Sequence, residues 1–161
     1  MIRRLRPDDA EELAALLRAN RDFLAPFDPV RDERFFTPAG QAERIGQHGN
    51  LFAILDGDEI AGTIAISNVV LGAFRSANVG YWVDRPRNGR GLGSGALAAI
   101  VETAFGELEL HRLEAGTLVD NIASQRVLER NRFTRIGVAP RYLHIGGAWR
   151  DHVLFQRTVE D

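Results

Sequence analysis

The sequence of 161 residues contains no cysteine and no lysine, and all 20 of its basic residues are arginines. The lack of cysteine excludes a disulfide framework, a cysteine nucleophile and thiolate metal sites. The lack of lysine excludes catalysis through a lysine Schiff base. The formal net charge of −2 gives no global basic field, so we expect no direct binding of nucleic acid.

Long apolar runs are missing as well. No stretch approaches the roughly 18 apolar residues of a membrane span, and Met1-Ile2-Arg3-Arg4-Leu5 does not resemble a signal segment. We therefore expect a cytoplasmic protein without a membrane partner. The four histidines, His48, His111, His144 and His152, show no metal-site spacing, so we expect no metal. The length fits a single domain over 1–161, either monomeric or homodimeric.

The residue pattern predicts a mixed α+β domain. We expect strands over 1–6, 51–55, 59–66, 77–84, 111–119, 133–138 and 152–158. We expect helices from Pro7, over 39–47, over 97–105 and from Asn121. The intervening segments predict a loop or broken helix over 20–38, a tight hairpin at 56–58, a loop over 68–76 and a link at 145–148.

The segment Asn88-Gly89-Arg90-Gly91-Leu92-Gly93-Ser94 lies between the apolar run 79–83 and the helical pattern 97–105. The first turn of a helix has unsatisfied N–H donors and a partial positive charge. Glycines allow a bulky anion to reach those donors without meeting a Cβ. The segment therefore predicts a binding site for the pyrophosphate of a cofactor.

Three other interpretations of this segment differ in how well they fit. Residues 91–96 match the dinucleotide pattern G-x-G-x-x-G/A, and Glu114 follows about twenty residues later, where a ribose-binding acid belongs. However, too much chain precedes the motif and too little follows for a dinucleotide-binding fold. A Walker A loop is excluded because no Gly-Lys-Ser/Thr follows. A purely structural turn remains open, although alternate glycines are entropically costly.

The segment resembles the acetyl-CoA loop of the GCN5-related N-acetyltransferases, Gln/Arg-x-x-Gly-x-Gly/Ala, with Asn88 in place of Gln or Arg. Residues 80–83, Asn121-Ile122-Ala123-Ser124 and 147–151 resemble the ribosomal-protein-alanine N-acetyltransferase branch of that family. The stretches that resemble its RimJ type are 20–24 with 29–33, and 142–145 with 149–154. Together these stretches extend over nearly the whole chain.

The resemblance implies a central, mostly antiparallel twisted sheet of about seven strands, flanked by about four helices, with a splayed parallel strand pair that holds acetyl-CoA. It implies that Trp82 and Val83 pair with pantetheine, and that Asn121 touches pantetheine while capping its helix. The implied pyrophosphate site consists of Asn88, Gly89, Arg90, Gly91, Leu92, Gly93 and Ser94. Arg85, Arg87 or Arg90 could contact a phosphate, or all three could belong to a solvated turn.

The implied reaction is attack of an amine on the acetyl thioester. Many relatives supply the leaving group's proton from a tyrosine, but the matching residue here is Leu128. The resemblance assigns that role to Ser124, whose alternative is a helix-capping position. Glu114 is the candidate base, although strand alternation could turn its side chain outward.

The resemblance implies a protein N-terminus as acceptor, with the terminal alanine of an S5-like ribosomal protein as the example. A free α-amine has a pKa of about 7.7–8.0 against about 10.4 for lysine, so an α-amine needs only a weak base. Asp32 and Glu33 could attract the amine, or form a charged loop. Tyr142 and Trp149 could wall the acceptor site, or simply pack. A small amine such as an amino acid, polyamine or aminoglycoside remains an alternative acceptor, as does a silent acyl-CoA-binding module.

Overall fold

The computed structural model describes residues 1–161, which form one seven-stranded sheet with the strand order β1-β2-β3-β4-β5-β7-β6. The strands are β1 (Ile2–Arg4), β2 (Leu51–Asp56), β3 (Glu59–Val70), β4 (Ser76–Val83), β5 (Arg112–Leu118), β6 (Thr134–Ile145) and β7 (Ala148–Thr158). All neighbours are antiparallel except β4 and β5, which are parallel. The expected mixed fold with one parallel pair is confirmed.

Five α-helices accompany the sheet: α1 (Ala10–Ala19), α2 (Arg21–Leu24), α3 (Pro38–Gln47), α4 (Leu92–Glu102) and α5 (Ile122–Arg130). The short helical turns are η1 (Pro7–Asp9), η2 (Ala25–Phe27), η3 (Glu33–Phe36), η4 (Arg85–Arg87) and the π-helical η5 (Thr103–Glu107). None of these helices combines the length and the apolar character that crossing a membrane requires.

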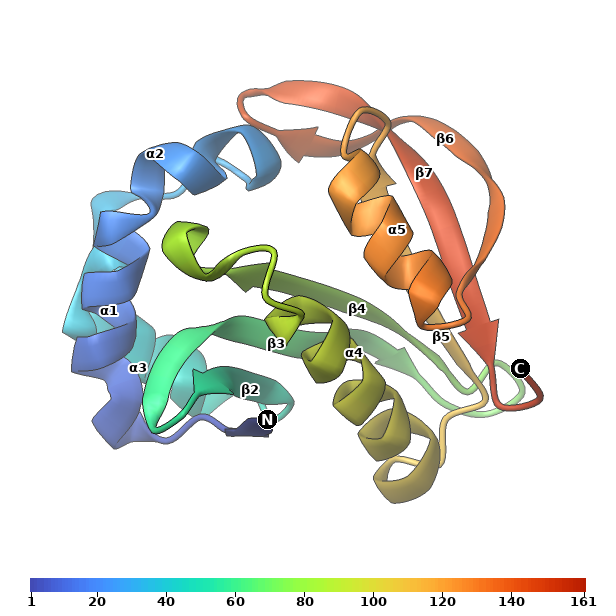
Figure 1. The fold of residues 1–161 in the computed structure, drawn as a ribbon, viewed down its shortest axis with the longest axis horizontal. Coiled ribbons are helices and arrows are strands. Elements are labelled where there is room, and N and C mark those ends of the chain that lie inside the picture. The colour runs from blue at the N-terminus through green and yellow to red at the C-terminus, as the bar shows by residue number, and fades with distance from the viewer.

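The helices cover the sheet from both sides and create two cores (Figure 1). Helices α4 and α5 lie over one face, where Leu97 and Leu128 pack with Ile64, Leu113 and other strand residues. Helices α1 and α3 cover the opposite face of β2 and β3, where Leu13 and other apolar side chains pack together. Strand alternation explains this division, because neighbouring residues of β2 and β3 point to opposite cores.

Strands β4 and β5 pair only at their beginnings. Ser76, Ala77 and Asn78 align with Arg112, Leu113 and Glu114, after which the two strands diverge. Strand β5 pairs along its whole length with β7, while the rest of β4 pairs with β3 alone. A V-shaped gap therefore opens in the middle of the sheet.

The sequence underestimated the final strand pair. Strand β6 continues beyond residue 138, where we expected it to end, and β7 begins before residue 152. The pair has a bulge between Ala139 and Leu143 and a tight turn at Gly146 and Gly147. Both glycines have positive φ, +59° and +85°, which such a turn requires. The residues outside the expected strands, 139–145 and 148–151, are mostly exposed, so they have no alternating apolar pattern to detect.

Candidate active site

The glycine-rich segment forms a loop at the start of α4, at the mouth of the V-shaped gap. Gly89 and Gly91 have φ angles of +78° and +82°, which strain any residue with a side chain. Gly91 occupies the N-cap of α4 without a capping side chain. The first N–H groups of α4 therefore lack a protein cap and remain available to an anion.

The side chains of this loop bind the protein itself. The Asn88 amide donates to the carbonyl of Val83 at 3.0 Å, and Arg90 forms two hydrogen bonds of 2.7 and 3.2 Å with Asp56. The hydroxyl of Ser94 accepts from Asn131 at 3.0 Å. These contacts hold the loop in place and leave its backbone as the part that faces outward. The Asn88 side chain thus fixes the loop to the end of β4.

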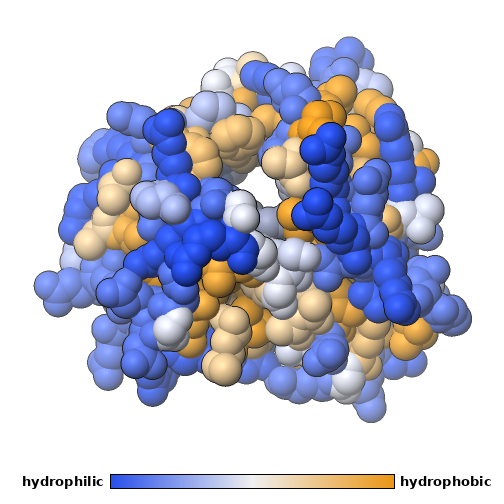
Figure 2. Space-filling model, in the orientation of Figure 1, coloured by the Kyte–Doolittle hydropathy of each residue, from blue (hydrophilic) through white to orange (hydrophobic).

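A cavity of about 420 Å³ occupies the gap between β4 and β5. Figure 2 shows an opening at the centre of the face on which α4 and α5 lie. Residues from both sides of the sheet line the cavity, including Ser124 and Asn121 on one side and Arg44 and Trp82 on the other. The cavity therefore connects the two faces of the sheet.

Thr117 lines this cavity from β5, and its hydroxyl is buried without a hydrogen-bond partner. Buried polar groups in native proteins almost always have partners. The unsatisfied Thr117 Oγ1 therefore points to a ligand in the gap. Together with the uncapped helix α4, this observation fits a ligand that has both an anionic and a polar extended part.

Ser124 faces Tyr81 across the cavity, with 3.2 Å between their hydroxyl oxygens. The side chain of Asn121 caps α5 by accepting from the backbone N–H of Ser124 at 3.3 Å. The Ser124 hydroxyl is therefore not needed as a cap. Burial raises the pKa of Tyr81, so its phenol stays protonated and can donate a hydrogen bond to the Ser124 hydroxyl.

Glu114 lies on β5 at the closed end of the gap and is not among the lining residues. Its carboxylate accepts from Arg112 at 2.6 Å and from the Tyr142 hydroxyl at 3.2 Å. Burial, followed by the negative charge of Glu114, raises the pKa of Tyr142. The structure thus places Glu114 in a hydrogen-bonded network beside the cavity.

His152 lies in the candidate active site, although the sequence alone did not predict it there. It is buried, lines the cavity and packs edge-on against the ring of Tyr142 at 5.5 Å between centroids. Its Nδ1 donates to the carbonyl of Arg150 at 2.9 Å, because a carbonyl only accepts. In the neutral ring, Nε2 then carries the lone pair and makes no bond within the protein. No local motif marks this histidine.

The carboxylates expected near an acceptor amine are engaged elsewhere. Asp32 accepts from the backbone N–H of Phe35 and so caps η3. Glu33 is exposed and forms an ion pair of 2.6 Å with Arg21. Trp149 is 63% exposed and packs on His144 rather than in the cavity. Among carboxylates, only Asp28 lines the cavity.

Comparison with known proteins identifies the family. Residues 1–134 match the family model described as an acetyltransferase (GNAT) domain. The [ribosomal protein uS5]-alanine N-acetyltransferase of Escherichia coli is 36% identical over 171 aligned residues, which cover 100% of this chain and 88% of the relative.

Two solved structures are similar over almost the whole chain. The ribosomal-protein-S5-alanine acetyltransferase of Vibrio fischeri superimposes with a TM-score of 0.94 at 33% identity, covering 99% of this chain and 93% of that one. RimJ of Mycobacterium smegmatis in complex with CoA-disulfide has a TM-score of 0.91 at 34% identity, covering 99% and 81%. The chain therefore belongs to the GNAT family and is a RimJ-like N-acetyltransferase whose acyl donor is acetyl-CoA.

Proposed function

We propose that this enzyme acetylates the N-terminal α-amine of a protein, with a ribosomal protein of the uS5 type as the leading substrate. The cavity through the sheet supports a polypeptide acceptor, because two further pockets adjoin it and Phe35 lines all three. A peptide that enters with its terminal amine needs such a path for the rest of its chain. Relatives named for the alanine of uS5 match this chain from end to end.

The donor side of the cavity would be formed mainly by backbone. Acetyl-CoA supplies an activated thioester when it is bound. The N–H groups of Gly89, Arg90, Gly91, Leu92, Gly93 and Ser94 would bind its diphosphate at the start of α4. Residues Trp82 and Val83 would pair with pantetheine, since β4 has no partner strand on that side beyond Asn78. Asn121 and the unsatisfied hydroxyl of Thr117 would contact the same arm.

Ser124 would stabilise the sulfur that leaves during transfer. Its hydroxyl can donate to sulfur while it accepts from the Tyr81 phenol, because each hydroxyl has one donor and two acceptor sites. The high pKa of Tyr81 keeps that phenol protonated at neutral pH. Preorganised donors of this kind act where negative charge develops.

The proton of the attacking amine needs a base. Glu114 is our candidate from the sequence, and His152 is a second candidate because its Nε2 is free and the residue lines the cavity. Tyr142 touches both residues. An α-amine with a pKa of about 8 is roughly a tenth neutral at pH 7, so a base of moderate strength suffices.

Variants of the two candidates separate their roles. Whichever of Glu114→Gln and His152→Gln removes the base should lower kcat/KM at least about a hundredfold and remove the acidic limb of the pH profile of kcat/KM. His144→Gln serves as the control, since His144 is exposed on the neighbouring strand. If both variants keep the wild-type profile, neither residue is the base.

Peptides with free or blocked N-termini test the acceptor. An alanine-terminated peptide should be acetylated, and N-formylation of the same peptide should abolish transfer even when it contains lysine. Equal acetylation of blocked, lysine-containing peptides would contradict the proposal. Turnover of small amines alone would favour the small-molecule alternative, and acetyl-CoA binding without any turnover would indicate a silent module.

A further inference from the structure

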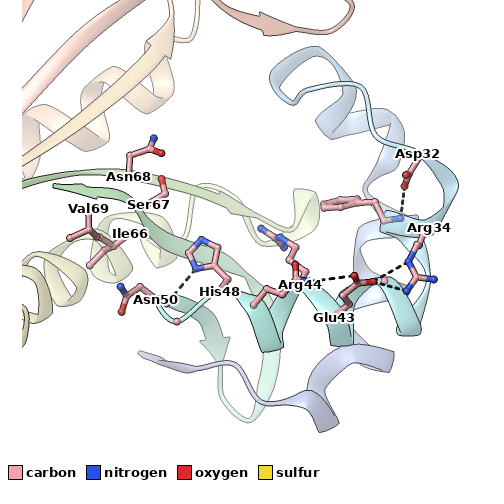
Figure 3. Close-up of a pocket in the computed structure, with 14 residues that line it drawn as sticks. Asp32, Arg34, Glu43, Arg44, His48, Asn50, Ile66, Ser67, Asn68 and Val69 are labelled. Carbon is pink, nitrogen blue, oxygen red and sulfur yellow. Dashed lines mark hydrogen bonds and ion pairs between the residues drawn. The ribbon is translucent and has the colours of Figure 1, made fainter.

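Arg44 lies where two cavities meet on the α1–α3 side of the sheet. The 420 Å³ cavity in the gap and a pocket of about 610 Å³ beside α3 share Phe35, Arg44, His48 and Ser67 as lining residues. Figure 3 shows the Arg44 guanidinium pointing away from the Glu43 carboxylate and towards the side of His48. The guanidinium of Arg44 therefore belongs to a side chain that lines both cavities.

Arg44 forms no ion pair, because the nearest carboxylate, Asp28, is bound to Arg31 instead. Its one hydrogen bond is to the amide oxygen of Gln41 at 3.3 Å. The other arginines nearby are satisfied. Arg31 binds Asp28 through two bonds of 2.9 and 3.1 Å, and Arg34 binds Glu43 at 2.6 and 3.2 Å.

The surroundings make this unpaired charge costly. Burial and the positive charge of Arg31 lower the pKa of Arg44, and the negative charge of Asp28 offsets them only in part, although an arginine remains charged in any protein. Burial and the charge of Arg44 lower the pKa of His48, so this histidine adds no second charge at neutral pH. The ring of Phe35 lies 4.4 Å from the guanidinium carbon of Arg31 and 5.4 Å from that of Arg44. An anion beside Arg44 would offset both the free-energy cost of burying its charge and the repulsion from Arg31.

The position of Arg44 in the fold shows which substrate would bring that anion. Arg44 projects from α3, whose apolar residues pack on the face of β2 and β3 opposite to α4. The uncapped start of α4 and the Ser124–Tyr81 pair lie with the other core. An anion at Arg44 is therefore not a phosphate held by the α4 loop, and it arrives with the acceptor.

We propose that Arg44 binds a carboxylate of the acceptor, so that the enzyme selects amines that carry an acidic group close to the reactive nitrogen. This inference rests on the proposed acyl transfer to an amine and names the acceptor's second recognition element. The carboxylate comes either from an acidic side chain that follows the terminal residue of a peptide or from the free carboxylate of a small amine. Arginine suits this task because its planar fork matches a carboxylate.

Matched acceptors and one variant test the proposal. Alanine-terminated peptides with Glu or Gln at the second or third position should differ, with kcat/KM about tenfold or more higher for the Glu peptide. Alanine and alaninamide form the small-molecule arm. In Arg44→Gln the preference for the acidic acceptor should fall to about one, mainly through a higher acceptor KM. Arg34→Gln, which removes an arginine already paired with Glu43 in the same pocket, should keep the preference.

The outcomes separate this inference from the function on which it rests. Equal rates for acidic and neutral acceptors in the wild type, or an undiminished preference in Arg44→Gln, would overturn the carboxylate site while acyl transfer stands. Loss of turnover on every amine, with acetyl-CoA still bound, would instead reject the proposed function. Calorimetric binding of acetyl-CoA to Arg44→Gln confirms that the variant is folded.

Discussion

The two sides of the cavity are built from different parts of the chain. On the α4–α5 side, the proposed binding groups are mostly backbone N–H groups that glycines leave accessible. On the α1–α3 side, they are side chains such as Arg44, Asp28 and His48. The first side can keep one ligand through many sequence changes, whereas a single substitution on the second side can change the acceptor.

One buried side chain connects the two sides. Asn20, at the end of α1, donates to the Leu16 carbonyl at 2.9 Å and to the Asp84 carboxylate at 2.7 Å. Its oxygen accepts from the backbone N–H of Arg85 at 2.9 Å, where the chain leaves β4 for the glycine loop. The helix that borders the acceptor side is thereby fixed to the loop of the donor side.

The largest effect is expected from Gly91→Glu. The new side chain would be strained at a φ of +82° and would bring a negative charge to the anion site, so acetyl-CoA binding should disappear. Isothermal titration calorimetry measures this loss. Gly106→Glu, with the same charge at an open position beyond the other end of α4, should bind as the wild type does. Normal affinity in Gly91→Glu would mean that this turn is not the site.

Ser124→Ala should affect the reaction more than the binding. Removing the hydroxyl should lower kcat about a hundredfold, because the departing sulfur loses its donor, with little change in the acetyl-CoA dissociation constant. Steady-state kinetics and calorimetry measure the two quantities. Tyr81→Phe should give a smaller decrease. A wild-type kcat in Ser124→Ala would mean that this residue, in the first turn of α5, has a structural role and no role in catalysis.

Asn20→Ala breaks the connection between the two sides. The change removes the hydrogen bonds of Asn20 to the Asp84 carboxylate and from the Arg85 N–H, so the free energy of unfolding should fall by about 2–3 kcal/mol. The Michaelis constants for both substrates should rise. Urea unfolding and kinetics measure these effects. If only the Michaelis constant for the acceptor amine changes, Asn20 does not position the glycine-rich loop that we propose binds acetyl-CoA.

The smallest effect concerns the start of α1 on the acceptor side. Hydrogen bonds from Arg3 hold the pKa of Asp9 below its usual value, so Asp9 stabilises the fold above the unfolded-state pKa of about 3.9. This contribution is lost as the pH falls through the folded-state pKa. Asp9→Asn should therefore cost about 1–2 kcal/mol at pH 7 in urea unfolding, and this cost should decrease steadily as the pH is lowered below about 3.9. Asp8→Asn, an exposed neighbour, should cost little across the same pH range.

Most of the fold could be predicted because its elements carry local signals. The glycine loop, the hairpin at Asp56-Gly57-Asp58 and the apolar helix α4 are visible in short windows of sequence. The ends of β6 and β7 could not be predicted, because an exposed ribbon has no apolar alternation. The roles of His152 and Arg44 have no local signal either, since they depend on which residues the fold brings near them.

By itself, the sequence determined the family and the acyl donor, because the motifs that indicate them are runs of neighbouring residues. Only the tertiary structure decided which side chains meet across the gap. Contacts such as Ser124 with Tyr81, or Asn20 with Asp84, join residues far apart in the chain. Their geometry is fixed by the divergence of β4 and β5, which results from the pairing of whole strands.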